Sequence, residues 1–151
     1  MEKILLITGL ILLLGIQSIA QPANKDFVIV GAGSDDANLR QVQKRYQKKS
    51  NAYFILESAT NPMEQISEAI AGKSIQNLHI FLTSKPNALM LNSLSVTSEN
   101  VAQFSESIMK WKNSVTGKIV FHSLVAFSTP EGLDLKRQME KLSGLECISV
   151  K

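Results

Sequence analysis

The chain has 151 residues, of which 44% are hydrophobic and 19% charged, and its formal net charge is +3. This length fits one domain that buries about two-thirds of its unfolded surface, so the fold needs no metal or disulfide to be stable. The only cysteine is Cys147, which excludes a disulfide within the chain. The sequence contains no internal repeat and no low-complexity tract, which excludes repeat architectures.

The first 20 residues have the pattern of a secretory signal peptide. Lys3 precedes the uncharged run Ile4–Ile16, and the small side chains of Ser18 and Ala20 follow it. Spanning a bilayer takes about 18 or more apolar residues, so this run is too short for a membrane anchor. No cysteine follows the run to carry a lipid. We therefore expect cleavage after Ala20 and a secreted or periplasmic protein.

Residues 21–25 are expected to form a short tail, and residues 26–151 alternate between strand and helix patterns. This alternation predicts a single α/β domain, a three-layer sandwich with a mostly parallel sheet of about five strands and helices on both faces. The expected strands are Phe27–Val30, Tyr53–Leu56, Leu78–Leu82, Ile119–Phe121 and Glu146–Val150, the last at a half-exposed edge. The sheet order should reverse near the first strand, and ligand sites in such sheets gather at the carboxyl ends of the strands.

Capping residues mark the starts of four expected helices. In chain order they are Asp35 or Asp36, Asn61, Thr97 or Ser98, and Thr129. Leu39, Val42 and Tyr46 recur at helical spacing in the first helix, and the third is expected to be long, with Val101, Phe104, Ile108 and Trp111 on its core face. Gly72 and Gly144 are expected to end the second and fourth helices. Between the third strand and the third helix, Pro86–Val96 predicts a small hairpin or extended excursion.

Gly31-Ala32-Gly33 follows the first expected strand, where a nucleotide-binding loop would lie. The third glycine of a dinucleotide fingerprint would fall on Asp36, whose carboxylate would repel the phosphates. These residues therefore predict a tight turn followed by an aspartate-capped helix. No cofactor is expected.

Much of the positive charge lies in the first expected helix, at Arg40, Lys44, Arg45, Lys48 and Lys49. An electrostatic patch for nucleic acid or an anionic glycan is one interpretation. The other is a solvated helix face, with lysines near the helix C-terminus favoured by its dipole. Positions 40, 44 and 48 share one helical stripe, and that stripe has no aromatic residue to stack bases. We therefore favour the solvated face and expect no nucleic-acid partner.

The only two histidines fall on expected strands. His79 lies within the third strand, which predicts a hydrogen-bonded core residue, and His122 ends the fourth strand, in the layer where a site could form. Ser123 should point to the opposite side from His122, so the two are poorly placed to act as nucleophile and base. No histidine or cysteine spacing suits zinc, so no metal is expected. Cys147 lies in an apolar strand pattern and should be buried.

From Phe54 onward, six segments carry a resemblance to a known domain. They are Asn61–Ala71 (NPMEQISEAIA), Leu78–Ser84 (LHIFLTS), Ala88–Leu91 with Ser98–Val101, Ile119–Ser123, and Leu142–Ile148 (LSGLECI). In this order the chain resembles an uncharacterised bacterial domain found near the N-termini of large adhesin-like and cadherin-repeat surface proteins. That domain in turn resembles the caspase and gingipain clan of cysteine peptidases. The resemblance covers roughly the last hundred residues and implies a caspase-like α/β fold.

The same resemblance locates a degenerate catalytic site. In the clan, a histidine followed by glycine ends the third strand and a cysteine, usually after glycine, ends the fourth. These positions fall on Thr83-Ser84 and on Ser123-Leu124, so neither catalytic side chain is present. The loss of a nucleophile–base unit costs several orders of magnitude in rate. Thr83 and Leu124 are expected to be neighbours at the carboxyl edge of the sheet.

Three functions remain open at this point. The favoured one is a secreted, non-catalytic module that binds a peptide, a surface polymer or an envelope protein at the strand ends. The second is a hydrolase with an unorthodox set of Ser123, Ser84 and His122. The third is a purely structural domain whose partner uses another face, such as the basic helix.

Overall fold

A five-stranded parallel sheet forms the centre of the protein. The computed structural model describes residues 26–31, 37–49, 52–58, 60–123 and 125–150. The strands are β1 (Asp26–Val30), β2 (Tyr53–Ile55), β3 (Ile75–Phe81), β7 (Val115–His122) and β8 (Glu146–Val150). Their order is β2-β1-β3-β7-β8, and each neighbouring pair is parallel. The predicted α/β fold with about five mostly parallel strands is therefore confirmed, including the reversal of order at β1.

Two sequence predictions lie outside the described residues. One is the signal peptide with its tail, residues 1–25, and the other is the aspartate cap within residues 32–36. In the part of the chain that the structure describes, no helix is both long and apolar enough to cross a membrane.

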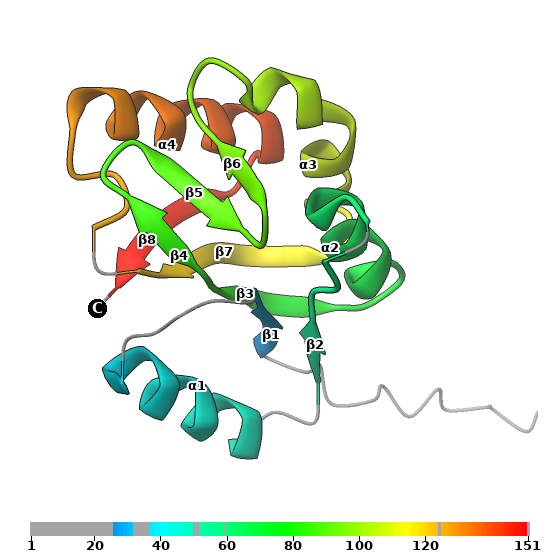
Figure 1. The fold of residues 1–151 in the computed structure, drawn as a ribbon. Coiled ribbons are helices and arrows are strands. Elements are labelled where there is room, and N and C mark those ends of the chain that lie inside the picture. Colours follow the sequence, from blue (N-terminus) through cyan, green and yellow to red (C-terminus); the bar gives the residue numbers. More distant parts are fainter. Residues whose placement is uncertain (1–25, 32–36, 50–51, 59, 124, 151) are drawn as a thin grey trace, which may run out of the picture.

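The helices cover the two faces of the sheet unequally (Figure 1). α1 (Ala37–Lys49) lies on one face, and α2 (Pro62–Ile70), α3 (Ser105–Trp111) and α4 (Pro130–Ser143) lie on the other. Because side chains alternate along a strand, each strand supplies both layers. Val28, Val30 and Phe81 face α1 and pack against its Val42 and Tyr46. The buried apolar residues of the main core lie on the other face of the sheet, toward α2, α3 and α4.

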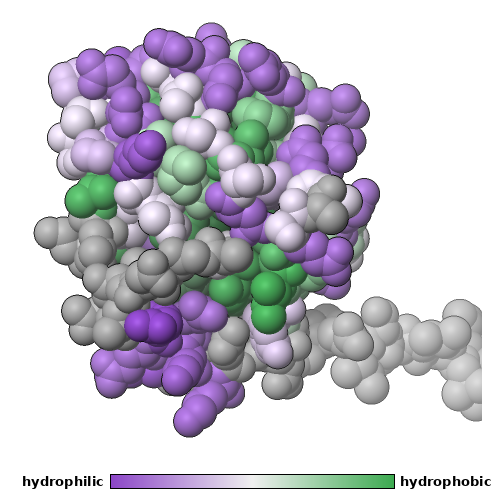
Figure 2. Space-filling model, viewed as in Figure 1, coloured by the Kyte–Doolittle hydropathy of each residue, from purple (hydrophilic) through white to green (hydrophobic). Residues whose placement is uncertain are grey.

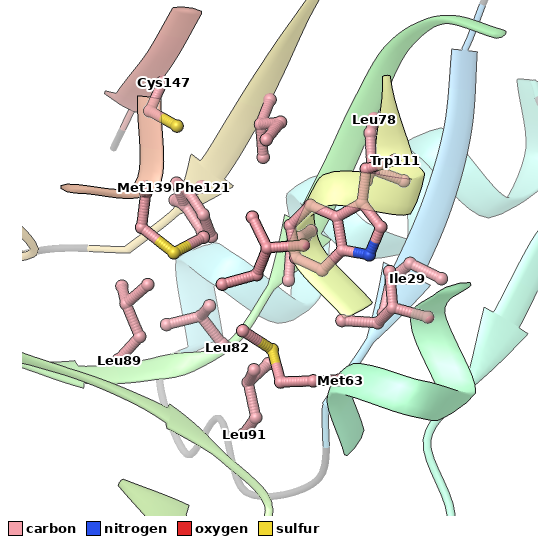
Figure 3. Packing of buried hydrophobic residues seen from close by; sticks show 14 of the residues in the cluster. Ile29, Met63, Leu78, Leu82, Leu89, Leu91, Trp111, Phe121, Met139 and Cys147 are labelled. Carbon is pink, nitrogen blue, oxygen red and sulfur yellow. The ribbon is translucent and has the colours of Figure 1, made fainter. Parts of the chain in front are cut away.

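The main core is centred on Trp111, which is fully buried. Figure 3 shows its indole between strand side chains such as Ile29 and Leu78 and the helical residue Met63. Full burial of each large apolar side chain stabilises the fold by about 1.5–3 kcal/mol. The one polar atom of the indole, Nε1, donates a hydrogen bond to Ser67 Oγ at 3.0 Å, so its burial leaves no donor unpaired.

The predicted signals for α2 and α4 are confirmed. Asn61 Oδ1 accepts a hydrogen bond from the Met63 amide at 3.0 Å, and Thr129 Oγ1 accepts one from the Gly132 amide at 3.1 Å. Gly144 ends α4 with a φ of 66°, a left-handed conformation that glycine adopts without strain.

The prediction of a long third helix is wrong for its first turns. Residues Val101–Phe104 form a short 3₁₀ segment, and regular α-helix begins only at Ser105. The residue before this segment is Asn100, and no side chain caps the segment. The Asn100 side chain instead accepts a hydrogen bond from the Thr97 amide at 2.8 Å. This turn replaces the helix start that the sequence pattern favours.

The predicted excursion after β3 is a small antiparallel sheet. It contains β4 (Thr83–Lys85), β5 (Ala88–Leu91) and β6 (Leu94–Val96), in that order. Its Leu89, Leu91 and Val96 are buried in the main core. The excursion therefore covers the three-helix face of the parallel sheet together with α3 and α4 (Figure 1).

Gly132 provides a test of how α4 meets this excursion. A Cβ atom at this position would lie 2.2 Å from the Pro86 carbonyl oxygen and 2.9 Å from Phe127 Cα, both backbone atoms. We expect Gly132→Ala to lower the free energy of unfolding by about 1–3 kcal/mol in urea denaturation, as overpacking does. Alanine would otherwise favour the helix by up to about 1 kcal/mol.

The control for this variant is Glu131→Ala in the same turn, where the side chain is exposed. The free energy of unfolding of Glu131→Ala should fall by no more than about 1 kcal/mol, the value of a favourable charge near a helix N-terminus. A Gly132→Ala protein as stable as the wild type would mean that the close approach of the two backbones is absent.

Candidate functional site

The parallel pairing of β3 with β7 brings polar side chains together on both faces of the sheet. Phe81 is paired with His122, and His79 with Val120. His79 and His122 point toward α1, as Phe81 does, whereas Ser123 follows on the other side of the strand. Two separate clusters result, an imidazole pair beneath α1 and a hydroxyl pair at the strand ends.

In the imidazole pair, His79 Nδ1 lies 2.9 Å from His122 Nε2. Both side chains are buried, as the sequence predicted for His79. The opposite nitrogen of His79, Nε2, lies 3.5 Å from Asp26 Oδ1, and that oxygen accepts a hydrogen bond from Asn77 Nδ2 at 2.9 Å. Three adjacent strands therefore contribute Asp26, His79 and His122 to one polar chain in an apolar layer.

The charge of Asp26 favours one tautomer of this chain. A proton on His79 Nε2 faces the carboxylate, so His79 Nδ1 is left as the acceptor. His122 must then donate from Nε2, and its Nδ1 is a buried acceptor without a hydrogen-bond partner among the described residues. The opposite tautomer would point a lone pair of His79 at the carboxylate, which is less favourable.

Aromatic rings enclose the imidazole pair. The rings of Phe81 and His122 are nearly parallel, with centroids 4.0 Å apart. Tyr46 of α1 contacts both imidazoles, with centroid distances of 4.6 Å to His79 and 5.2 Å to His122. The pair is therefore a structural element that joins α1 to the sheet.

Burial makes both imidazoles weak bases. Burial, together with the neighbouring His79, lowers the pKa of His122 to about 4. The pKa of His79 is also lowered by burial, although the charge of Asp26 opposes that shift. Both rings are therefore neutral near pH 7 and add no positive charge to the layer.

The hydroxyl pair joins Ser84 of β4, the strand that directly follows β3, to Ser123 at the carboxyl end of β7. Ser84 Oγ and Ser123 Oγ are in hydrogen-bond contact. Ser123 Oγ also accepts hydrogen bonds from the amides of Val125 and Ala126, at 3.2 and 3.0 Å. The Ser123 side chain is 1% exposed, so this oxygen is a structural acceptor with little access to a substrate.

The structure brings together only part of each predicted set. In the unorthodox hydrolase set, the Ser84 and Ser123 hydroxyl groups are in contact. The His122 ring lies on the other face of the sheet and is hydrogen-bonded to His79. Thr83 is exposed and begins β4 opposite Met90. Leu124 lies outside the described residues, so its expected proximity to Thr83 stays a prediction.

Cys147 is fully buried on β8, as predicted. Burial, together with the nearby Glu140 carboxylate, raises the pKa of its thiol to about 12. Glu140 Oε1 is held close because it accepts a hydrogen bond from the Cys147 amide at 3.0 Å. A thiol that stays protonated is neither a nucleophile nor a metal ligand.

A groove of about 280 Å³ lies between α2 and α3, away from both clusters. Its walls include Glu64, Glu68 and Glu106, and Lys110 is paired with Glu106 at 3.0 Å. These residues make it an acidic surface groove without a nucleophile–base pair. Within the described residues, no group of three or more histidine, cysteine or acidic side chains is placed to hold a metal ion.

The first expected turn and the basic helix are described in part. The Gly31 amide donates a hydrogen bond to the Phe81 carbonyl at 2.8 Å, which ties the end of β1 to β3, whereas residues 32–36 lie outside the described part of the chain. Arg40, Lys44, Arg45 and Lys48 are exposed along α1, as both interpretations of the basic helix require. The side chain of residue 49 is not described.

Sequence reasoning missed the polar chain that links Asp26, His79 and His122. The signal was present, because parallel strands in register place side chains of equal parity on one face. Asp26 starts β1, and His79 and His122 share the parity of Phe81 in the paired strands. The pattern within each strand alone does not show that the two histidines are in contact.

The imidazole pair predicts a pH-dependent stability. The pKa of His122 is about 4 in the folded protein and about 6.5 when unfolded. Below pH 6.5 the unfolded chain therefore binds a proton that the folded chain does not, so the free energy of unfolding falls as the pH drops. We expect a loss of about 3 kcal/mol between pH 6.5 and 4, measured by urea denaturation at successive pH values.

The matched variant is His122→Gln, which keeps an amide that can donate to His79 Nδ1 but does not titrate. Its stability should fall less steeply over the same interval, with the remaining slope due to His79 and to carboxylates. A slope equal to that of the wild type would show that His122 is not the group responsible.

Cys147 gives a second prediction at neutral pH. Its buried, protonated thiol should react with a disulfide reagent more than about a hundredfold slower in the folded protein than in urea. The released thiolate of the reagent is measured by absorbance, and Cys147→Ser is the blank. Rapid reaction of the folded protein would mean that the β8 region opens readily.

Comparison with known proteins identifies one family. The chain matches the family described as Domain of unknown function (DUF4347) over residues 28–149, which is most of the chain and all of the parallel sheet except the ends of β1 and β8. No curated protein gives a match. No solved structure gives one either. Residues 28–149 account for well over half of the sequence, and the chain therefore belongs to the DUF4347 family.

Proposed function

We propose that this chain is an exported, non-catalytic binding module with a degenerate cysteine-peptidase-like site. Its ligand would be a peptide, a surface polymer or another envelope protein. The observation that carries the proposal is the contact of Ser84 with Ser123 at the ends of β3 and β7. The two strand ends meet there, and neither a thiol nor an imidazole is found at that contact among the described residues.

The distribution of the reactive side chains supports the non-catalytic role. The only thiol is sealed within the core on β8, with a pKa of about 12. The two imidazoles are hydrogen-bonded to each other beneath α1, on the face of the sheet opposite Ser123. Acyl transfer by a serine or cysteine needs a base within hydrogen-bond reach of the nucleophile, and the described residues provide no such pair.

The family membership is consistent with this proposal and adds no activity to it. The hydrolase alternative would need the Ser123 oxygen to reach a substrate, but Ser123 is buried and its oxygen already accepts two backbone amide hydrogen bonds and contacts Ser84. No base replaces His122 on that side of β7 in the described part of the chain. The binding module is therefore the better-supported function.

The test is a search for turnover. We expect the purified protein to show no labelling by a fluorophosphonate reagent and no hydrolysis of acyl ester or peptide substrates, because Ser123 is buried and lacks a base. An active serine hydrolase serves as the positive control, and Ser123→Ala is the matched variant. Turnover that disappears in Ser123→Ala would refute the proposal.

A further inference from the structure

The charge of the protein is concentrated on one helix. Of the 16 lysines and arginines in the chain, five belong to α1, which has no acidic residue. The rest of the chain has 11 cationic residues against 13 acidic ones, so α1 accounts for the whole positive net charge. Figure 2 shows this helix as a hydrophilic surface at one end of the molecule. An exposed cluster of one sign attracts a partner of the other.

The edge strand β2 lies at the same end of the molecule and carries exposed apolar side chains. Tyr53 is 50% exposed and Ile55 is 55% exposed. They are paired with Val28 and Val30 of β1, so they lie on the face of the sheet that α1 partly covers. Figure 2 shows a hydrophobic patch over β2, next to the hydrophilic surface of α1.

The backbone of β2 also has an open side. The Val28 amide bonds to the Ala52 carbonyl at 3.1 Å, and the Leu56 amide bonds to the Val30 carbonyl at 2.9 Å. Backbone groups alternate along a strand, so the N–H and C=O groups of Tyr53 and Ile55 point away from β1. β2 ends the sheet order, and no strand among the described residues lies on that side. These groups can therefore pair with another extended chain.

We propose that β2 accepts an extended acidic peptide as an added strand, with acidic side chains directed toward the basic surface of α1. This inference rests on the proposed binding function and names its ligand class. The outward backbone groups of Tyr53 and Ile55 provide hydrogen bonds to the peptide, and their side chains provide an apolar contact. On an added strand every second side chain lies on the α1 face, where carboxylates meet exposed lysines and arginines.

The backbone geometry favours a peptide over other anions. A lipid surface or a glycan could meet the charges of α1, but neither presents the regular alternation of N–H and C=O groups that an open strand edge pairs with. An extended acidic peptide can contact the basic surface of α1, pack on the apolar side chains of β2 and pair with the outward backbone groups of β2 at the same time.

The experiment measures binding of a labelled peptide of alternating glutamate and valine by fluorescence anisotropy. The purified protein should bind it, and a lysine–valine peptide should not bind. Binding should weaken in about 1 M salt, where the screening length falls to about 3 Å. The Glu–Val peptide should stay intact by mass spectrometry. Cleavage of the peptide would refute the proposed non-catalytic function while leaving the docking site in place.

Two variants of Ile55 test the strand edge. Ile55→Pro removes an outward N–H that β1 does not use, so the fold should persist while peptide affinity falls about tenfold or more, consistent with a disrupted edge. Ile55→Lys keeps the backbone and places a charge on the edge, which also opposes strand addition. Circular dichroism checks folding of both. Wild-type affinity in both variants would overturn the proposal.

Charge reversal tests the α1 surface. Lys44→Glu with Lys48→Glu should weaken the Glu–Val peptide about tenfold or more. The control reverses Lys112 and Lys141, two exposed lysines of the three-helix side, with the same change in net charge and no expected effect. Equal losses in both double variants would overturn the proposal, since only overall charge would matter. Binding of phosphatidylglycerol vesicles or heparin in place of the peptide would overturn it too.

Discussion

The parallel pairing of β3 with β7 is the constraint on which the rest of the structure depends. These two strands form the middle of the sheet with β1, and their register decides which side chains meet on each face. One face receives the imidazole pair and the other receives the Trp111 core and the hydroxyl contact. A shift by one residue would exchange the two sets, so the register alone separates the bases from the hydroxyl groups.

This separation places the histidines, Ser123 and the thiol in structural contacts. The histidines are used to join a helix to the sheet, and the serine at the end of β7 is used to hold the following turn. The thiol is packed as an apolar side chain. The two imidazoles, Ser123 and the thiol therefore each have a structural role, and the recognition surface that we propose is the sheet edge with its adjoining helix.

Sequence patterns predicted the fold well because strand and helix periodicity, caps and glycines are local signals. Asn61, Thr129 and Gly144 act at the predicted boundaries. The start of the third helix was predicted wrongly because residues Val101–Phe104 form a 3₁₀ segment, which the spacing of apolar residues does not distinguish from a regular α-helix. The meeting of Asp26 with His79 depends on strand register, which needs the tertiary structure. Sequence placed Ser123 away from His122 correctly, because parity along one strand is local.

The helix α1 has a consequence for local dynamics. Among the side chains that the structure describes, those of Val42 and Tyr46 join α1 to a small cluster on the sheet, whereas the three-helix face shares one continuous core. Elements with few buried contacts detach at a lower free-energy cost than the global unfolding of the domain. Detachment of α1 would expose both imidazoles to water, where they can be protonated. Acidic pH would therefore favour a state in which α1 is detached from the sheet while the three-helix side stays folded.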